Sequence, residues 1–158
     1  MRLLFAAVLL SLPGVFAGAA EPPKVAVFEM ALVDSSLEGE MTGADAAEAA
    51  RLDLLDLELR SRLEASERLQ VLVPGETTDL GCRACELDAA EALDADFALS
   101  AWVQKVSDLI LNINLKVTAV DSGRVVFQDS VDIRGNTDDS WLRGLRYLVD
   151  RRLLAPPG

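Results

Sequence analysis

The sequence of 158 residues contains no histidine. Histidine is the side chain that most often acts as a general base near neutral pH, and it is the commonest metal ligand. Its absence excludes imidazole-based catalysis, histidine metal sites, and serine or cysteine triads of the usual kind. Carboxylates are plentiful, but no motif places two of them for acid–base work. The sequence therefore predicts no catalytic residue.

Long apolar runs are also scarce, and the one that exists lies at the amino end. Arg2 is followed by a short apolar stretch, then by Pro13 and a run of small residues. These are the three parts of a secretory signal peptide. We therefore expect residues 1–20 to be a signal that is cleaved near Ala19 or Ala20. The mature protein is predicted to be periplasmic, with no membrane span and no lipid anchor.

Basic residues are outnumbered, with 15 Lys and Arg against 26 Asp and Glu and a net charge of −11. Arg2 is the only charged residue of the first twenty, so signal removal leaves −12. This balance argues against a general binder of nucleic acid or anionic membrane. Residues 21–96 carry 19 acids and 6 bases, whereas residues 97–158 carry 7 and 8. The asymmetry favours a solvated acidic helix, with a surface for a basic partner as the alternative.

Three consecutive segments in the second half are predicted as an antiparallel meander. Residues 97–106 are apolar at nearly every position, which is typical of a strand in the middle of a sheet. Residues 109–118 alternate between apolar and polar side chains, and residues 124–133 form a third run. Gly123 accepts the positive φ that a tight hairpin between the last two strands demands.

The remaining elements follow from short apolar runs and from helical spacing. We expect strands at residues 24–28 and 69–73 and helices at residues 42–65, 82–93 and 137–155. The first helix places a leucine stripe toward the core, formed by Leu52, Leu55, Leu59 and Leu63. Residues 21–158 are thus predicted as a single α/β (α+β) domain. It has one mixed five-stranded sheet, the element order β-α-β-α-β-β-β-α, and helices packed on the sheet.

Cys82 and Cys85 form the only motif with potential chemistry, a C-x-x-C pair at the start of a predicted helix. In an exported protein, cysteines this close are expected to be oxidised to each other or to serve redox exchange. A helix start stabilises a thiolate, which favours the redox interpretation. A structural disulfide is the first interpretation, redox function the second, and a metal site shared with other ligands the third.

Two further groups are candidates for binding. Asp34, Glu38 and Glu40 lie in a predicted polar loop after the first strand, where α/β folds commonly bind ligands. Their spacing does not match an EF-hand, so an ordinary solvated loop is favoured over a metal site. Trp102, Asn112 and Asn114 stand on predicted strands and form a possible interaction face, with core packing as the alternative for Trp102.

The order of elements, together with residues 25–28, 93–103 and 121–126, resembles the domain shared by the amino-terminal part of TolB and the curli-secretion protein CsgG. The chain resembles more closely a family of small secreted proteobacterial proteins of unknown function. The segments that carry this second resemblance are residues 24–28, 34–40, 82–86, 102–114 and 131–145.

The resemblance implies a non-enzymatic periplasmic binding or assembly module with a protein partner and no cofactor. It also implies an accessory role beside periplasmic quinoprotein alcohol oxidation. The alternative function is thiol–disulfide redox exchange through Cys82 and Cys85. Channel activity is not implied, because the chain lacks the lipid-anchor cysteine and the pore-forming segment of the curli protein.

Overall fold

The computed structural model of the chain describes residues 21–43, 45–75 and 82–156. The predicted signal at residues 1–20 lies outside the described residues, as do residues 76–81. The side chains of Glu38 and Thr42 also lie outside this part.

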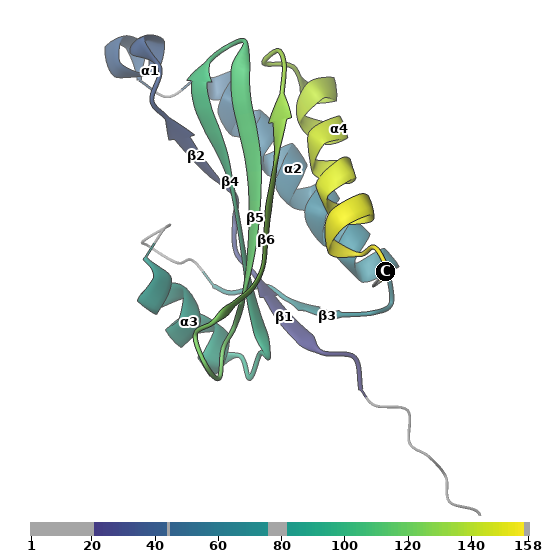
Figure 1. Ribbon diagram of the computed structural model, residues 1–158. Helices are drawn as coiled ribbons and strands as arrows, with labels where there is room; N and C mark the ends of the chain where they lie inside the picture. Colours follow the sequence, from purple (N-terminus) through teal and green to yellow (C-terminus); the bar gives the residue numbers. More distant parts are fainter. Residues whose placement is uncertain (1–20, 44, 76–81, 157–158) are drawn as a thin grey trace, which may run out of the picture.

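Six strands and several helices alternate along the described chain (Figure 1). The strands are β1 (Lys24–Val27), β2 (Ala31–Asp34), β3 (Gln70–Leu72), β4 (Phe97–Ser107), β5 (Ile110–Ala119) and β6 (Val125–Ile133). The helices are α1 (Leu37–Thr42), α2 (Ala46–Ala65), α3 (Arg83–Ala92) and α4 (Asp138–Leu148), and α4 continues into a π-helical turn, η1 (Val149–Leu153).

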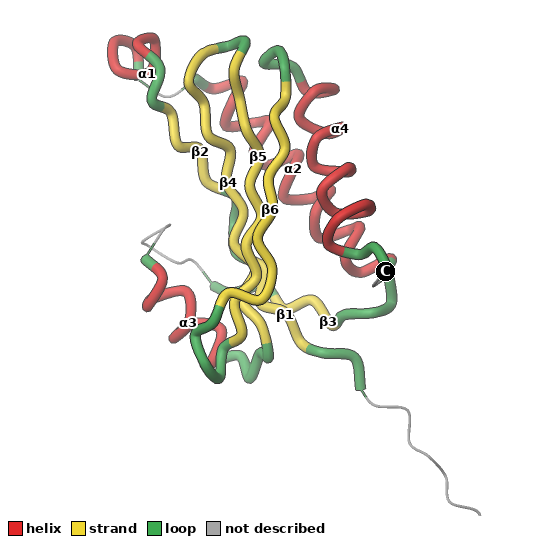
Figure 2. The backbone as a smooth tube through the Cα atoms, in the orientation of Figure 1, coloured by secondary structure: helices red, strands yellow, loops and turns green. Residues whose placement is uncertain are grey.

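The strands form one mixed sheet in the order β3-β1-β4-β5-β6, with β2 also paired to β4 (Figure 2). β1 runs parallel to both β3 and β4, so β1, α2 and β3 make a βαβ unit. β4, β5 and β6 are antiparallel neighbours, which confirms the meander. Gly123 has a φ of 62° in the last hairpin, as the turn requires. The predicted mixed α/β fold is confirmed.

The prediction of five strands was wrong, because β2 is a sixth. Val27 lies opposite Leu99 and Ala31 lies opposite Trp102, so β1 and β2 follow the same strand with one extra residue between them. At this interruption the backbone N–H of Met30 loses its place in the ladder. It donates instead to the carboxylate of Asp56 on α2, at 3.0 and 3.2 Å.

The main core lies between one face of the sheet and the helices α2 and α4 (Figure 1). Three of the four predicted leucines of α2 are fully buried, and Leu52 packs against them. Trp141 of α4 is also fully buried. At Gly144 an added Cβ would lie 2.6 Å from Ile133 Cγ2, so the missing side chain lets α4 approach β6 closely.

α2 begins one turn later than the sequence suggested. Asp45 is its N-cap and accepts a hydrogen bond from the backbone N–H of Ala47, whereas Thr42 closes the separate short helix α1. None of the helices in the described ranges is both long and apolar enough to cross a membrane.

Candidate functional site

The face of the sheet opposite α2 and α4 is only half covered. α3 packs on its lower part, against a small cluster that includes Ala26, Phe28 and Ala98. Over the upper part, which carries β2 and the adjoining lengths of β4, β5 and β6, no described helix lies on this face (Figure 1). We call this upper part the open face. It is defined by Ala31, Val33, Trp102, Gln104, Asn112, Asn114, Ser130 and Asp132.

Strand register places the predicted interaction residues side by side on the open face. Trp102 lies opposite Asn114, and Asn112 lies opposite Gln104, which is two residues beyond Trp102 on β4. Trp102 is neither buried nor fully exposed. The structure therefore brings Trp102, Asn112 and Asn114 together, as expected from the alternation of β5.

The amides of the open face are ordered by hydrogen bonds. Asn112 Nδ2 donates to Asp132 Oδ1 across the β5–β6 pair at 2.8 Å. Asn114 Nδ2 donates to the backbone carbonyl of Asn112 at 3.5 Å, and Gln104 Nε2 donates to Ser35 Oγ at 3.3 Å. An aromatic side chain beside fixed amides combines apolar area with directional hydrogen bonding, which is the composition that protein interfaces favour.

A buried polar contact lies at the boundary between the open face and the part of the sheet that α3 covers. Ser100 Oγ donates to Glu86 Oε2 of α3 at 2.7 Å, and Lys116 Nζ lies 3.6 Å from the same oxygen. Ser100 and Lys116 are cross-strand partners on β4 and β5. The two side chains balance the charge and hydrogen bonding of Glu86, so this trio fastens α3 to the sheet.

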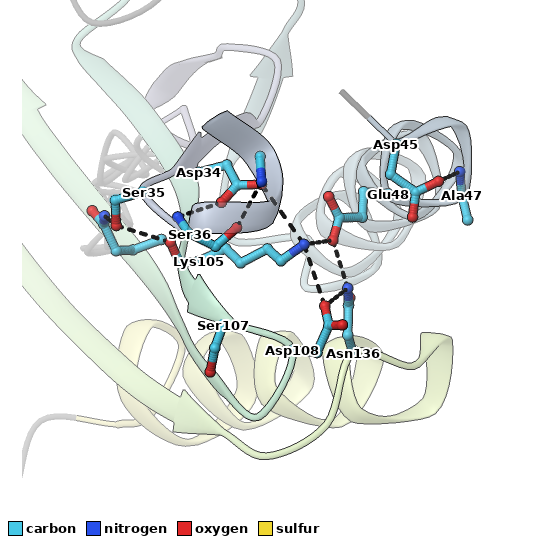
Figure 3. A network of polar contacts seen from close by, with 12 residues as sticks. Asp34, Ser35, Ser36, Asp45, Ala47, Glu48, Lys105, Ser107, Asp108 and Asn136 are labelled. Carbon is cyan, nitrogen blue, oxygen red and sulfur yellow. Dashed lines mark hydrogen bonds and ion pairs between the residues drawn. The ribbon is translucent and has the colours of Figure 1, made fainter. Parts of the chain in front are cut away.

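A second polar cluster lies on the core side of the sheet, at the same upper end, around Lys105 (Figure 3). Its ammonium lies 2.6 Å from Glu48 Oε1, 3.2 Å from Asp108 Oδ1 and 3.7 Å from Asp34 Oδ2. Asn136 Nδ2 donates both to Glu48 Oε1 at 2.5 Å and to Asp108 Oδ1 at 3.0 Å. The cluster thus links β2, α2, the β4–β5 turn and the β6–α4 loop.

The central ion pair of this cluster, Lys105 with Glu48, is buried. The side chains of Lys105 and Glu48 are 4% and 1% exposed. Burial alone would lower the pKa of Lys105, but hydrogen bonds and charge interactions with Glu48 and Asp108 outweigh it and raise that pKa. Burial likewise opposes ionisation of Asp34, yet hydrogen bonds from Ser36 and the charge of Lys105 hold its pKa below the usual range.

The Lys105 cluster forms one wall of a cavity of about 810 Å³. Arg51 of α2 lies in the same wall, donates to Asn136 Oδ1 at 3.0 Å and to Asp138 Oδ1 at 2.8 Å, and covers the Trp141 ring at 5.9 Å from its centroid. Gly39 of α1 and Gly43, which caps the end of α1, also line the cavity. Lys105 and Arg51 in the lining contact other polar groups, whereas Glu48 Oε2 is buried without a hydrogen-bond partner among the described residues.

The predicted polar loop of Asp34, Glu38 and Glu40 was wrong as a structure, because Asp34 ends β2 and the two glutamates lie in α1. Ser36 caps α1, and its backbone N–H donates to Asp34 Oδ1 at 2.8 Å. Asp34 also faces Lys105, whereas Glu40 is exposed. Within the part of the chain that the structure describes, no three Cys, Asp or Glu side chains are placed to hold a metal ion.

Cys82 and Cys85 form a disulfide with an S–S distance of 2.05 Å. Cys82 is the N-cap of α3, and its sulfur accepts a hydrogen bond from the backbone N–H of Cys85 at 3.2 Å. The disulfide therefore closes the first turn of α3. Glu86 of the same helix accepts the hydrogen bond from Ser100.

Sequence reasoning missed Lys105, Glu48 and Asn136 as a group. Lys105 is the one charged residue in the largely apolar run from residue 97 to 106, and this was the available signal. A lysine at a buried position of a strand needs a buried acid. Which acid provides it depends on the packing of α2, and no local pattern specifies that.

The described fold defines an α/β class that is found in several solved proteins. PelC from Paraburkholderia phytofirmans, solved as a dodecamer, superposes with a TM-score of 0.61 at 16% identity, over 88% of this chain and 92% of PelC. The LpoB C-terminal domain from Escherichia coli gives 0.52 at 13% identity, over 73% and 85%. TolB from Acinetobacter baumannii gives 0.51 at 10% identity, over 87% of this chain but 29% of TolB. At these identities the likeness shows the fold alone, and it confirms the predicted resemblance to TolB at that level.

The chain belongs to the family DUF3280, described as "Protein of unknown function (DUF2380)", which matches residues 23–153. No curated protein matches the sequence.

Proposed function

We propose that the chain is a non-enzymatic accessory module of the periplasm that works by binding another protein. The observation that carries this proposal is the open face, where Trp102 is left partly exposed beside ordered amides. An uncovered sheet face with an aromatic centre and a polar surround has the composition of a protein-binding surface. Export rests on the predicted signal at residues 1–20 and agrees with the Cys82–Cys85 disulfide, since such bonds persist in oxidising compartments.

Two further points support a binding role over catalysis. Most charged groups of the Lys105 cluster are engaged in ion pairs and hydrogen bonds with one another, with Glu48 Oε2 as the exception, and groups held in this way are structural in character. PelC, which shares the fold, is a dodecamer, and this supports the use of the fold in protein assembly.

The experiment is affinity capture from cell envelope extracts with the wild-type chain and with Trp102→Ala. The wild type is expected to retain a specific protein, and the variant to retain it about tenfold less, because a central aromatic typically contributes more than 1 kcal/mol to binding. Leu57→Ala, which removes an exposed leucine of α2, is the matched control and is expected to bind like the wild type. Equal capture by wild type and Trp102→Ala would contradict the proposal.

We place the partner among components of periplasmic quinoprotein alcohol oxidation, on the ground of the family resemblance. Capture is therefore to be compared between cells grown with and without an alcohol as carbon source. The expected result is a partner enriched under alcohol growth. Capture of the same unrelated protein under both conditions would contradict this pathway while leaving the binding role intact.

The second candidate function is thiol–disulfide exchange, which is favoured by the position of the cysteine pair at the start of α3. The reduction potential of the pair separates the two functions. A potential below about −300 mV is typical of structural disulfides, and an exchange protein would have a higher one. We expect the lower value, with partner capture unchanged in the Cys82→Ser/Cys85→Ser variant.

A further inference from the structure

The upper end of the molecule carries an apolar projection that is largely exposed. Leu37 and Met41 are 78% and 85% exposed, and their spacing of four residues puts them on one side of α1. Glu40, in the same helix, and Asp45, three residues after its end, are also exposed and add negative charge to this region. We call Leu37, Met41 and Glu40 the α1 projection.

A groove of opposite character lies at the other edge of the sheet, between β6 and α4. Its volume is about 260 Å³, and its lining combines Asp132, Arg134, Ser140 and Arg143 with the four less polar residues Val131, Ile133, Gly144 and Tyr147. Small-molecule pockets usually exceed about 300 Å³, so the size suits protruding side chains better than a separate ligand. We call the four less polar residues the β6–α4 groove.

The charges at the two places are complementary. Arg134 and Arg143 border the groove and are both exposed, while Asp132 is the acid in its lining. Arg143 also lies 3.4 Å from Asp139 in an exposed pair, which solvent screens strongly. The groove is therefore the more basic of the two surfaces, and the α1 projection the more acidic.

The position of the two surfaces adds a second argument. Among the described strands, β2 and β6 each pair on one side only, and at the upper end they form the two edges of the sheet. Figure 1 shows α1 beside β2 and α4 beside β6. Unpaired edges are usually covered or blunted in stable proteins, because they can pair with other chains.

From these observations we propose that the chain self-associates head to tail, with the α1 projection of one copy in the β6–α4 groove of the next. We assign the occupant as a second copy of the chain because one molecule carries both surfaces, the more acidic α1 projection and the more basic β6–α4 groove. A symmetric contact between two α1 projections would bring the Glu40 side chains of both copies together, and like charges oppose such a contact. Head-to-tail contacts use different surfaces on the two copies, so they generate rings or open chains.

The test is sedimentation velocity over a concentration series, on protein obtained by expressing the full sequence from residue 1 to residue 158. The wild type is expected to form oligomers that weaken with added salt. Met41→Glu disables the projection and Tyr147→Glu disables the groove, and each is expected to weaken association about tenfold or more. Leu57→Glu, at an exposed leucine of α2, is the matched control and is expected to behave like the wild type. Circular dichroism verifies that each variant is folded.

A mixture of the two disabled variants gives the sharpest outcome. Met41→Glu keeps its groove and Tyr147→Glu keeps its projection, so the mixture is expected to form a one-to-one dimer that neither variant forms alone. A monomeric wild type at all concentrations, equal weakening by Leu57→Glu, or no dimer in the mixture would each overturn the proposal. Trp102→Ala is expected to assemble normally, so loss of partner capture and loss of self-association are separable.

Discussion

Lys105 shows how a single charged residue can organise one end of the molecule. It lies in the central strand at a position whose side chain faces the core, next to Leu111 on β5. Glu48, Asp108 and Asp34 surround its ammonium, so the charge remains while its pKa is raised. A raised pKa means that this stabilisation is complete below the ordinary lysine pKa, hence at neutral pH, and is lost only in strongly alkaline solution.

We predict that Lys105→Met lowers the free energy of unfolding by about 3–5 kcal/mol, because it leaves the Glu48 carboxylate buried without its cation. The Lys105→Met/Glu48→Met double variant is expected to recover most of this loss. Urea unfolding followed by circular dichroism measures both. Lys24→Met, which breaks the exposed Lys24–Asp94 pair, serves as the control and is expected to change little. A loss for Lys105→Met no larger than that of the control would contradict the buried network.

The sequence predicts some residues well and others poorly, for identifiable reasons. Leu55, Leu59 and Leu63 repeat with helical spacing, so their burial follows from local pattern alone. The trio of Lys105, Glu48 and Asn136 comes from three separate elements, and no local pattern brings them together. Asn112 and Asn114 were predictable because strand alternation fixes the face of each side chain.

At the scale of elements, the packing of α4 on β6 depends on one missing side chain. We predict that Gly144→Ala lowers the free energy of unfolding by about 1–3 kcal/mol, because a Cβ at 2.6 Å from Ile133 Cγ2 forces α4 away from the sheet. Gly75→Ala is the matched control, since its Cβ would meet nothing within 4 Å. Thermal unfolding of the two variants measures the difference, and equal midpoints would refute this account of α4 packing.

The disulfide at the start of α3 is expected to be a local brace. We predict that Cys82→Ser/Cys85→Ser lowers the free energy of unfolding by about 2 kcal/mol, since the closed loop is only a few residues long. Denaturant unfolding of the variant and of the oxidised wild type gives this value. A much larger loss would show that the bridge supports more of the fold than the first turn of α3.

β2 is the strand that the sequence did not reveal. Its four residues, Ala31–Asp34, show no clear alternation, and the sequence gives no reason for the chain to resume pairing after an interruption. The pairing becomes favourable because Asp56 of α2 accepts the hydrogen bond that Met30 cannot make in the ladder. Met30 and Asp56 are 26 residues apart in the sequence, so no local sequence pattern could predict this contact. The meander, in contrast, depends on tight turns and was predicted correctly.

For the whole molecule, the distribution of helices leaves one part of the sheet uncovered. α2 and α4 cover one face of the sheet completely enough to form the main core, while the short helix α3 covers only the lower part of the other. The uncovered remainder is the open face, and it coincides with the residues predicted as an interaction surface, Trp102, Asn112 and Asn114. Whether this face binds a protein is therefore the central question.

Site-specific photo-crosslinking in living cells tests that question most directly. A photoreactive residue replaces Asn114 on the open face, and in a matched strain it replaces Glu64, an exposed position on α2. We predict one discrete adduct with another envelope protein from position 114, lost when Trp102→Ala is added, and no such adduct from position 64. Identical adduct patterns at the two positions, or none at position 114, would contradict binding through the open face.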